Sequence, residues 1–167
     1  KIDEVYGMHN WPGVELGKFA IRSGPFFAAS DFIEATISGK GGHAAKPQET
    51  IDPTVIASQI VVALQTIASR RADPVKQVVV SVTSFETSSN AFNVIPQEVK
   101  IKGTVRTLDP EVRDLAEKEF LRITKLTAEA LGGSADAKYT RGYPVMSNSD
   151  QQTEFAAKVA RDVSGKC

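Results

Sequence analysis

Apolar and polar residues alternate in three segments of the chain, and this period of two is typical of β-strands with one buried face. In the first segment, Ile33, Ala35 and Ile37 are separated by mostly polar neighbours. A further segment consists almost entirely of β-branched residues, which favour extended strands. The pattern therefore predicts four strands, at 32–38, 78–83, 99–106 and 135–141.

Two other segments carry apolar residues at helical spacing. The first begins with Asp52 and Pro53, a capping acceptor followed by a proline whose missing N–H costs nothing at that position, and it continues to about Arg71. The second begins with the same device at Asp109 and Pro110 and ends at a Gly-Gly pair. We predict a long helix in each segment.

The resulting order is strand, helix, strand, strand, helix, strand, which predicts an α+β, ferredoxin-like βαββαβ fold. Two helices would cover one face of a four-stranded antiparallel sheet, and the other face would be polar and carry Arg106. Outside this unit we predict a strand at 14–22, a turn at 23–25 and a capped helix after 148–150. Such a fold hosts many functions, so the chemistry must come from particular residues.

Composition limits the class of protein. The chain has 167 residues, of which 41% are apolar and 24% charged, and its 20 basic and 20 acidic residues cancel. A neutral chain without a long apolar run is expected to be soluble, and we expect no nucleic-acid or membrane partner. Cys167 is the only cysteine, so no intrachain disulfide can form, in agreement with a cytoplasmic location.

The segment at 39–47, GKGGHAAKP, places His43 among residues of very small volume. Such a loop can approach another surface closely and present the imidazole to it, although a histidine that only hydrogen-bonds its own turn would fit as well. His9 lies in GMHNWP at 7–12, where a loop imidazole beside an aromatic ring is again the plain alternative. The two histidines alone do not complete a metal site, because a catalytic zinc usually has three protein ligands.

Four motifs in order resemble those of the two-metal amidohydrolases and carboxypeptidases, the family of hippurate hydrolase, aminoacylase and indoleacetyl-amino-acid hydrolase. The motifs are GMHNWP at 7–12, GKGGHAAKP at 39–47 with Asp52-Pro53, NVIP at 93–96 and GTVRT at 103–107. Together they are far more specific than any one of them.

The resemblance implies a metal-dependent amidohydrolase about twice as long as this chain, which hydrolyses the linear amide of an N-acyl amino acid or small peptide-like substrate. Residues 28–143 would be its lid and dimerisation domain, through which a homodimer forms. Residues 1–27 and 144–167 would belong to the two catalytic-domain segments on either side.

The resemblance also implies roles for single residues. His9 would bind one of two divalent metal ions, which could be zinc, manganese, cobalt or nickel. His43 would reach the partner subunit's active site and stabilise the oxyanion, and Asn93 and Arg106 would bind the substrate, Arg106 through its carboxylate.

Several parts of the family pattern are absent from the 167 residues. The other metal ligands and the catalytic glutamates are missing, so we expect this portion alone to be inactive and to bind no metal. Ser88-Ser89 stands where the family usually has Gly-Gly. The alternative hypothesis is a non-catalytic association or small-molecule-binding module of ferredoxin-like shape. The sequence does not select the acyl group, the amino acid or the metal.

Overall fold

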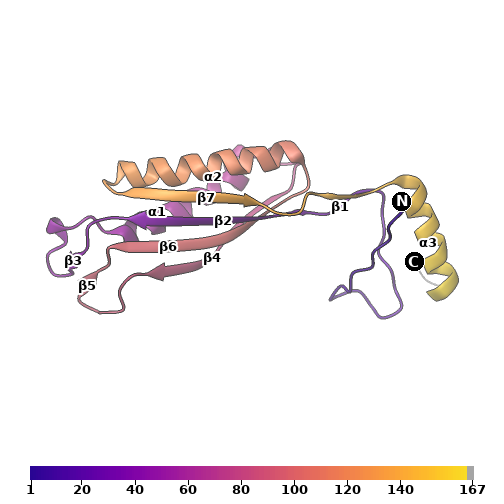
Figure 1. Cartoon of the computed structure of the whole chain (residues 1–167), viewed down its shortest axis with the longest axis horizontal. Coiled ribbons are helices and arrows are strands. Elements are labelled where there is room, and N and C mark those ends of the chain that lie inside the picture. The colour runs from indigo at the N-terminus through magenta and orange to yellow at the C-terminus, as the bar shows by residue number, and fades with distance from the viewer. Residues whose placement is uncertain (165–167) are drawn as a thin grey trace. The chain divides into compact units, whose positions relative to one another are not determined.

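The computed structural model describes residues 1–164 (Figure 1), and the predictions about Cys167 lie outside them. The chain divides into two compact units. Unit 2 runs from Phe27 to Met146, and unit 1 consists of Lys1–Phe26 and the segment that begins at Ser147. The domain assignment made from the sequence, with its borders at 27 and 143, stays a prediction.

The secondary structure follows the predicted order closely, with several short elements in addition. The elements are β1 (Gly24–Phe27), β2 (Ala29–Ser38), β3 (Gly42–His43), a 3-10 turn η1 (Pro47–Glu49), α1 (Pro53–Thr66), a π-helical turn η2 (Ile67–Arg71), β4 (Val78–Thr87), β5 (Val94–Ile95), β6 (Glu98–Thr107), α2 (Pro110–Ala130), β7 (Ser134–Arg141), β8 (Met146–Asn148) and α3 (Asp150–Ser164).

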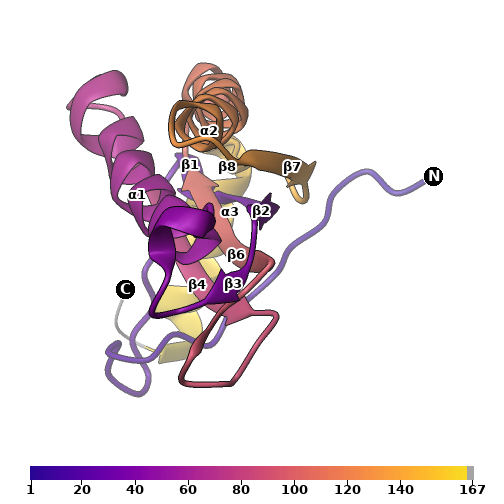
Figure 2. The ribbon, with the colours of Figure 1, turned by 90° about the vertical axis from the view of Figure 1, so that its left-hand side faces the viewer.

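Unit 2 contains a four-stranded antiparallel sheet with the order β4-β6-β2-β7. Viewed from the end of the strands, α1 and α2 lie on the same face of this sheet (Figure 2). The predicted α+β, ferredoxin-like βαββαβ fold is therefore confirmed. The central pair β2 and β6 is in register from Ala29 opposite Thr107 to Ser38 opposite Glu98.

Both predicted helix starts are capped as expected. The Asp52 side chain accepts from the backbone N–H of Thr54 at 2.8 Å. The Asp109 side chain accepts from Glu111 at 2.8 Å and from Val112 at 3.2 Å. Each cap satisfies backbone donors that the first helical turn leaves without partners, so the two helices begin where the sequence places them.

The core lies between the sheet and the two helices. Its buried residues come from alternate positions of the strands and from one stripe of each helix, as the two periodicities require. The members include Ile33, Ala35, Ile37, Val99, Ile101 and Val105 of the sheet and Ile56, Ile60, Leu64, Phe120 and Ile123 of the helices.

The other face of the sheet is open and mostly polar, as predicted. Lys100 and Lys102 of β6 are exposed there, and Lys138 of β7 pairs with Glu34 of β2 at 3.2 Å. Phe32 also lies on this face and is partly exposed. Within β6, Gly103 faces a bulge in β4, where a Cβ would lie 2.1 Å from the Ser81 carbonyl oxygen.

The strand predicted at 14–22 is wrong. Residues 14–17 contain a bend and a turn, and residues 18–22 have no regular secondary structure. Gly13 and Gly17 have φ values of 93° and 81°, which interrupt an extended chain on either side of Val14. The turn predicted at 23–25 is instead the start of β1, which pairs with β8. The helix predicted after 148–150 is present as α3. No helix within residues 1–164 has the length and apolar character that crossing a bilayer requires.

Candidate functional site

The structure brings His43 and Asn93 together at one end of unit 2. His43 of β3 is opposite Val94 of β5, and the backbone N–H of Ala44 donates to the carbonyl of Asn93 at 2.9 Å. The two segments lie side by side beyond the end of β2 in Figure 1. We call the residues 39–46 and 88–95 together the tip. The sequence suggested a loop around His43, whereas the structure forms a short paired strand.

The ring of His43 is exposed and has a defined tautomer. Its Nδ1 accepts from the backbone N–H of Ala45 at 3.1 Å. A neutral imidazole that accepts at Nδ1 carries its proton on Nε2. The local turn therefore leaves an Nε2–H donor on an exposed side chain, which is the group that an oxyanion needs.

Gln97 holds the glycine-rich segment to the sheet. Its side-chain Oε1 accepts from the N–H of Gly41 at 3.0 Å, and its Nε2 donates to the carbonyl of Gly39 at 2.8 Å. Lys40 and Ile51 also exchange two backbone hydrogen bonds, of 2.8 and 3.0 Å. These hydrogen bonds therefore hold the backbone of the glycine-rich segment in one position, although its side chains are small. Sequence reasoning missed Gln97 because its partners lie far away in the chain.

The close approach of the Ile51 backbone explains why residue 39 is a glycine. A Cβ at this position would lie 2.1 Å from the carbonyl oxygen of Ile51. Gly42 is less constrained, because its Cβ would meet only the Cγ2 methyl of Thr50, at 2.8 Å. The first glycine of the motif thus serves backbone packing, and this packing positions the strand that carries His43.

Arg106 lies at the opposite end of the sheet, beside Ser30 of β2. Glu98, which pairs with Ser38 at the tip end of the sheet, is eight residue steps along β6 from Arg106. At a rise of roughly 3.3 Å per residue this is about 26 Å. The structure therefore does not bring Arg106 together with His43 and Asn93 within one chain.

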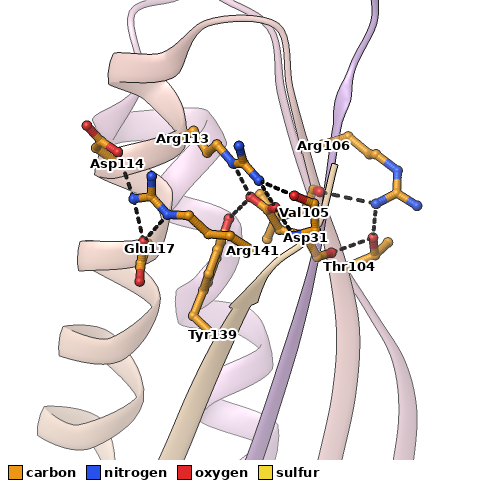
Figure 3. A network of polar contacts seen from close by, with 10 residues as sticks. Asp31, Thr104, Val105, Arg106, Arg113, Asp114, Glu117, Tyr139 and Arg141 are labelled. Atoms are coloured by element: carbon orange, nitrogen blue, oxygen red, sulfur yellow. Dashed lines mark hydrogen bonds and ion pairs between the residues drawn. The ribbon is translucent and has the colours of Figure 1, made fainter. Parts of the chain in front are cut away.

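The guanidinium of Arg106 is held by its neighbours on β6. Nη1 donates to Thr104 Oγ1 at 2.5 Å and to the carbonyl of Val105 at 3.3 Å (Figure 3). Thr104 Oγ1 in turn donates to the carbonyl of Asp31 at 2.9 Å. The position of Arg106 is therefore connected through Thr104 to the backbone of β2.

The side chain of Asp31 lies on the covered face, where it is fully buried and accepts four hydrogen bonds. Arg113 donates from Nε at 2.9 Å and from Nη2 at 2.5 Å, Tyr139 donates its hydroxyl at 2.7 Å, and Gly142 donates its backbone N–H at 3.0 Å (Figure 3). The network joins β2, β7 and α2 at the end of the sheet that carries Arg106.

The network shifts the pKa values of its members in opposite directions. Burial alone would raise the pKa of Asp31, but the hydrogen bonds from Arg113, Tyr139 and Gly142 and the charge of Arg113 hold that pKa below its usual range. Burial and the neighbouring carboxylate raise the pKa of Tyr139. Asp31 is therefore an anion and Tyr139 a neutral donor.

His9 lies in unit 1, and its ring contacts its own segment. Nδ1 donates to the carbonyl of Asn10 at 2.5 Å, and the ring meets Trp11 edge-on with centroids 5.7 Å apart. Histidine ligands commonly donate one ring N–H to a carbonyl while the other nitrogen binds the metal, so this tautomer suits the predicted role. Within residues 1–164, however, no three histidine, cysteine or acidic residues gather as a metal site would require.

Comparison with known proteins identifies relatives along the whole chain. Residues 30–130 match the family described as peptidase dimerisation domain. The chain is 43% identical over 150 residues to the N-acyl-L-amino acid amidohydrolase of Geobacillus stearothermophilus, covering 90% of this chain and 40% of the relative. It is 38% identical over 166 residues to the hippurate hydrolase of Campylobacter jejuni, and the match covers 98% of this chain and 43% of that relative.

Among solved structures, the YXEP protein of Bacillus subtilis, described as a dinuclear metal binding peptidase from the M20 family, superimposes with a TM-score of 0.69 at 29% identity, covering 94% of this chain and 38% of that one. The chain thus spans about two fifths of the length of the proteins it matches.

Proposed function

Because this chain belongs to the peptidase dimerisation domain family, we propose that it is the lid and dimerisation portion of a metal-dependent amidohydrolase. The substrates are N-acyl amino acids, whose amide bond is cleaved to a carboxylic acid and an amino acid. The names of relatives that cover nearly the whole chain support this reaction class. The tautomer and exposure of His43 supply the donor that amide hydrolysis needs.

The observation that carries the proposal is the separation of Arg106 from the tip. An N-acyl amino acid is about 10 Å long when extended, since it is no longer than three residues. One substrate cannot therefore touch both Arg106 and His43 of the same lid, because about 26 Å of the sheet, from Arg106 to Glu98, separates Arg106 from the end that carries the tip. We infer that each active site takes Arg106 from its own subunit and His43 with Asn93 from the partner.

Each residue then has a defined chemical task. Two divalent ions bound to the full-length protein supply a Lewis acid and an activated water, and His9 is one of their ligands. His43 donates from Nε2 to the oxyanion of the tetrahedral intermediate. The Asn93 side chain hydrogen-bonds the substrate, and Arg106 pairs with its carboxylate. Such donors on a lid act most strongly after closure, when water is excluded.

The outward face of α1 supports a homodimer. Its exposed residues are Val55, Ser58, Gln59, Val62, Gln65 and Thr66, and α1 carries no charged residue between Pro53 and Thr66. The exposed face of α2, in contrast, is densely charged. An uncharged, partly apolar helix face in an otherwise charged protein is typical of a surface covered in the assembly. We infer that the second copy of the chain covers it.

Subunit mixing tests the proposal in the full-length protein. His9→Ala removes a metal ligand and His43→Ala removes the donor, so each homodimer is expected to lose turnover. After equimolar mixing, half of the dimers are mixed, and each has one site with an intact metal centre and an intact partner histidine. Activity on hippurate should then return to roughly a quarter of the wild-type value.

Two results would overturn the proposal. If His43→Ala alone keeps its kcat, the histidine has no role in turnover. If the mixture stays inactive while size-exclusion chromatography shows exchanged dimers, the histidine does not act across the interface. A wild-type protein that binds N-acyl amino acids but hydrolyses none of them would support a non-catalytic binding module instead.

A further inference from the structure

Phe92 is the most exposed aromatic residue among residues 1–164, with a relative exposure of 107%. It is one of the two central residues of the turn that the backbone N–H of Val94 closes onto the carbonyl of Ala91 at 3.4 Å. Asn93 is the other. Leaving a phenylalanine side chain in water forgoes the favourable free energy of burying it. Nothing in the turn itself requires this residue.

The turn is held in place on both sides. Ser88 Oγ accepts from the backbone N–H groups of Gln97 and Glu98, each at 3.2 Å, and Ser89 Oγ accepts from Ala91 at 3.3 Å. The carbonyl of Asn93 accepts from Ala44, next to His43. Phe92 is therefore presented from a hydrogen-bonded turn that is joined to the strand of His43.

This placement fits the acyl side of the substrate. Consecutive Cα atoms are 3.8 Å apart, so Phe92 must lie next to Asn93 at whatever surface the tip contacts. In the proposed site, Arg106 of one subunit takes the carboxylate and His43 of the other reaches the amide oxygen. The acyl group extends from the amide carbon away from the carboxylate, toward the subunit that supplies the tip.

We propose that Phe92 enters the partner subunit's cleft and forms part of the apolar surface on which the acyl group lies. The lid then contributes to specificity and favours large apolar or aromatic acyl groups over acetyl, because two aromatic rings gain both burial and edge or offset stacking. The inference rests on the proposed function and adds a substrate determinant to it.

The test compares kcat/KM for the N-benzoyl and N-acetyl derivatives of one amino acid in the full-length enzyme. Phe92→Ala should lower the benzoyl-to-acetyl ratio about tenfold or more, while Phe92→Leu should lower it less. The melting temperature should stay unchanged, because the side chain packs against no core residue. Val75→Ala, which truncates an apolar side chain of 85% exposure outside the tip, should leave the ratio as in the wild type.

Mixing with His9→Ala decides whether Phe92 acts on the partner's substrate. When Phe92→Ala subunits are mixed with a large excess of His9→Ala subunits, nearly every intact metal centre faces a lid that still carries Phe92. The benzoyl-to-acetyl ratio should then return to the wild-type value.

A ratio that stays as low as in the Phe92→Ala homodimer would overturn the inference, and so would an unchanged ratio in Phe92→Ala itself. Equal losses on both substrates would also overturn it, because they indicate a general role in turnover. If the wild type hydrolyses neither substrate, the proposed function fails before this inference is reached.

Discussion

Arg106 donates from Nη1 to the hydroxyl of Thr104 over 2.5 Å, and this contact determines which edge of the guanidinium remains for a ligand. A threonine hydroxyl has one hydrogen, and Thr104 donates it to the carbonyl of Asp31. Thr104 can therefore only accept from Arg106. The Nε and Nη2 groups are left as a parallel pair of donors, the geometry that binds a carboxylate with two hydrogen bonds.

Thr104→Val removes the acceptor with little change in volume, so the guanidinium loses its orientation. We expect KM for an N-acyl amino acid to rise roughly tenfold, in line with the loss of a hydrogen bond to a charged group. For the same N-acyl amino acid with its carboxylate replaced by a carboxamide, KM should not change. Thr104→Ser should retain wild-type KM, and Thr36→Val, on the same face near the other end of β2, serves as control. Equal effects on both substrates would contradict this role.

Arg113→Met should destabilise unit 2 strongly. The variant leaves the fully buried carboxylate of Asp31 without its cation, and such losses cost about 3–5 kcal/mol in the free energy of unfolding. Lys125→Met is the matched control, since its ion pair with Glu129 is 3.9 Å long and exposed, and it should cost less than about 0.5 kcal/mol. Urea unfolding followed by circular dichroism measures both. Similar urea midpoints for the two variants would show that the buried Arg113–Asp31 pair contributes little to the free energy of unfolding.

The lowered pKa of Asp31 makes stability depend on pH. The pKa is below its ordinary value of 3.8 in the folded state, so the unfolded chain takes up the proton more readily. The stabilisation is complete at pH values above 3.8 and is lost as the pH falls through the folded-state pKa. In urea titrations, the difference in unfolding free energy between wild type and Asp31→Asn should be constant from pH 7 to about 5 and shrink below 3.8. A difference that does not vary with pH would contradict this coupling.

Gly39→Ala should disrupt the tip more than Gly42→Ala. The added methyl at position 39 meets a backbone carbonyl, which cannot move without breaking the pairing of Lys40 with Ile51. At position 42 it meets only the end of the Thr50 side chain, which can rotate. We expect kcat of the full-length enzyme to fall at least tenfold for Gly39→Ala, as a displaced oxyanion donor implies, with a smaller change for Gly42→Ala. Amide hydrogen exchange at Ala44 would report the same order, and the reverse order would contradict it.

Val62→Glu places a charge on the uncharged face of α1. If a second copy covers this face, the variant should shift the protein from dimer to monomer at micromolar concentration, as measured by size-exclusion chromatography with light scattering. Leu126→Glu is the control, because Leu126 is an exposed apolar residue of α2. It should leave the dimer intact. A dimeric Val62→Glu protein would place the interface elsewhere.

The order of the main elements could be derived from the sequence because their signals are local. Alternation around Ile33, Ala35 and Ile37 and the cap-then-proline pairs at Asp52 and Asp109 act within one strand or one helical turn. The same local reasoning was wrong at 14–22, where the positive φ angles of Gly13 and Gly17 prevail over the apolar pattern.

The site depended on contacts that local patterns do not encode. The residue types at His43, Asn93 and Arg106 indicated chemistry through their motifs, but their spacing along the chain gave no distances. Gln97 could not be found from the sequence, since a glutamine that binds two glycine backbones has no periodic signature. The exposure of Phe92 likewise appears only after the turn is folded.

The sequence by itself determined the family resemblance, the α+β fold and the identity of the candidate residues, because these follow from residue types, caps and periodicity. Only the tertiary structure decided that His43 and Asn93 share the tip while Arg106 lies at the opposite end of the sheet, about 26 Å along β6 from Glu98, since strand register sets that arrangement. Register arises from long-range backbone pairing, which no short stretch of sequence specifies.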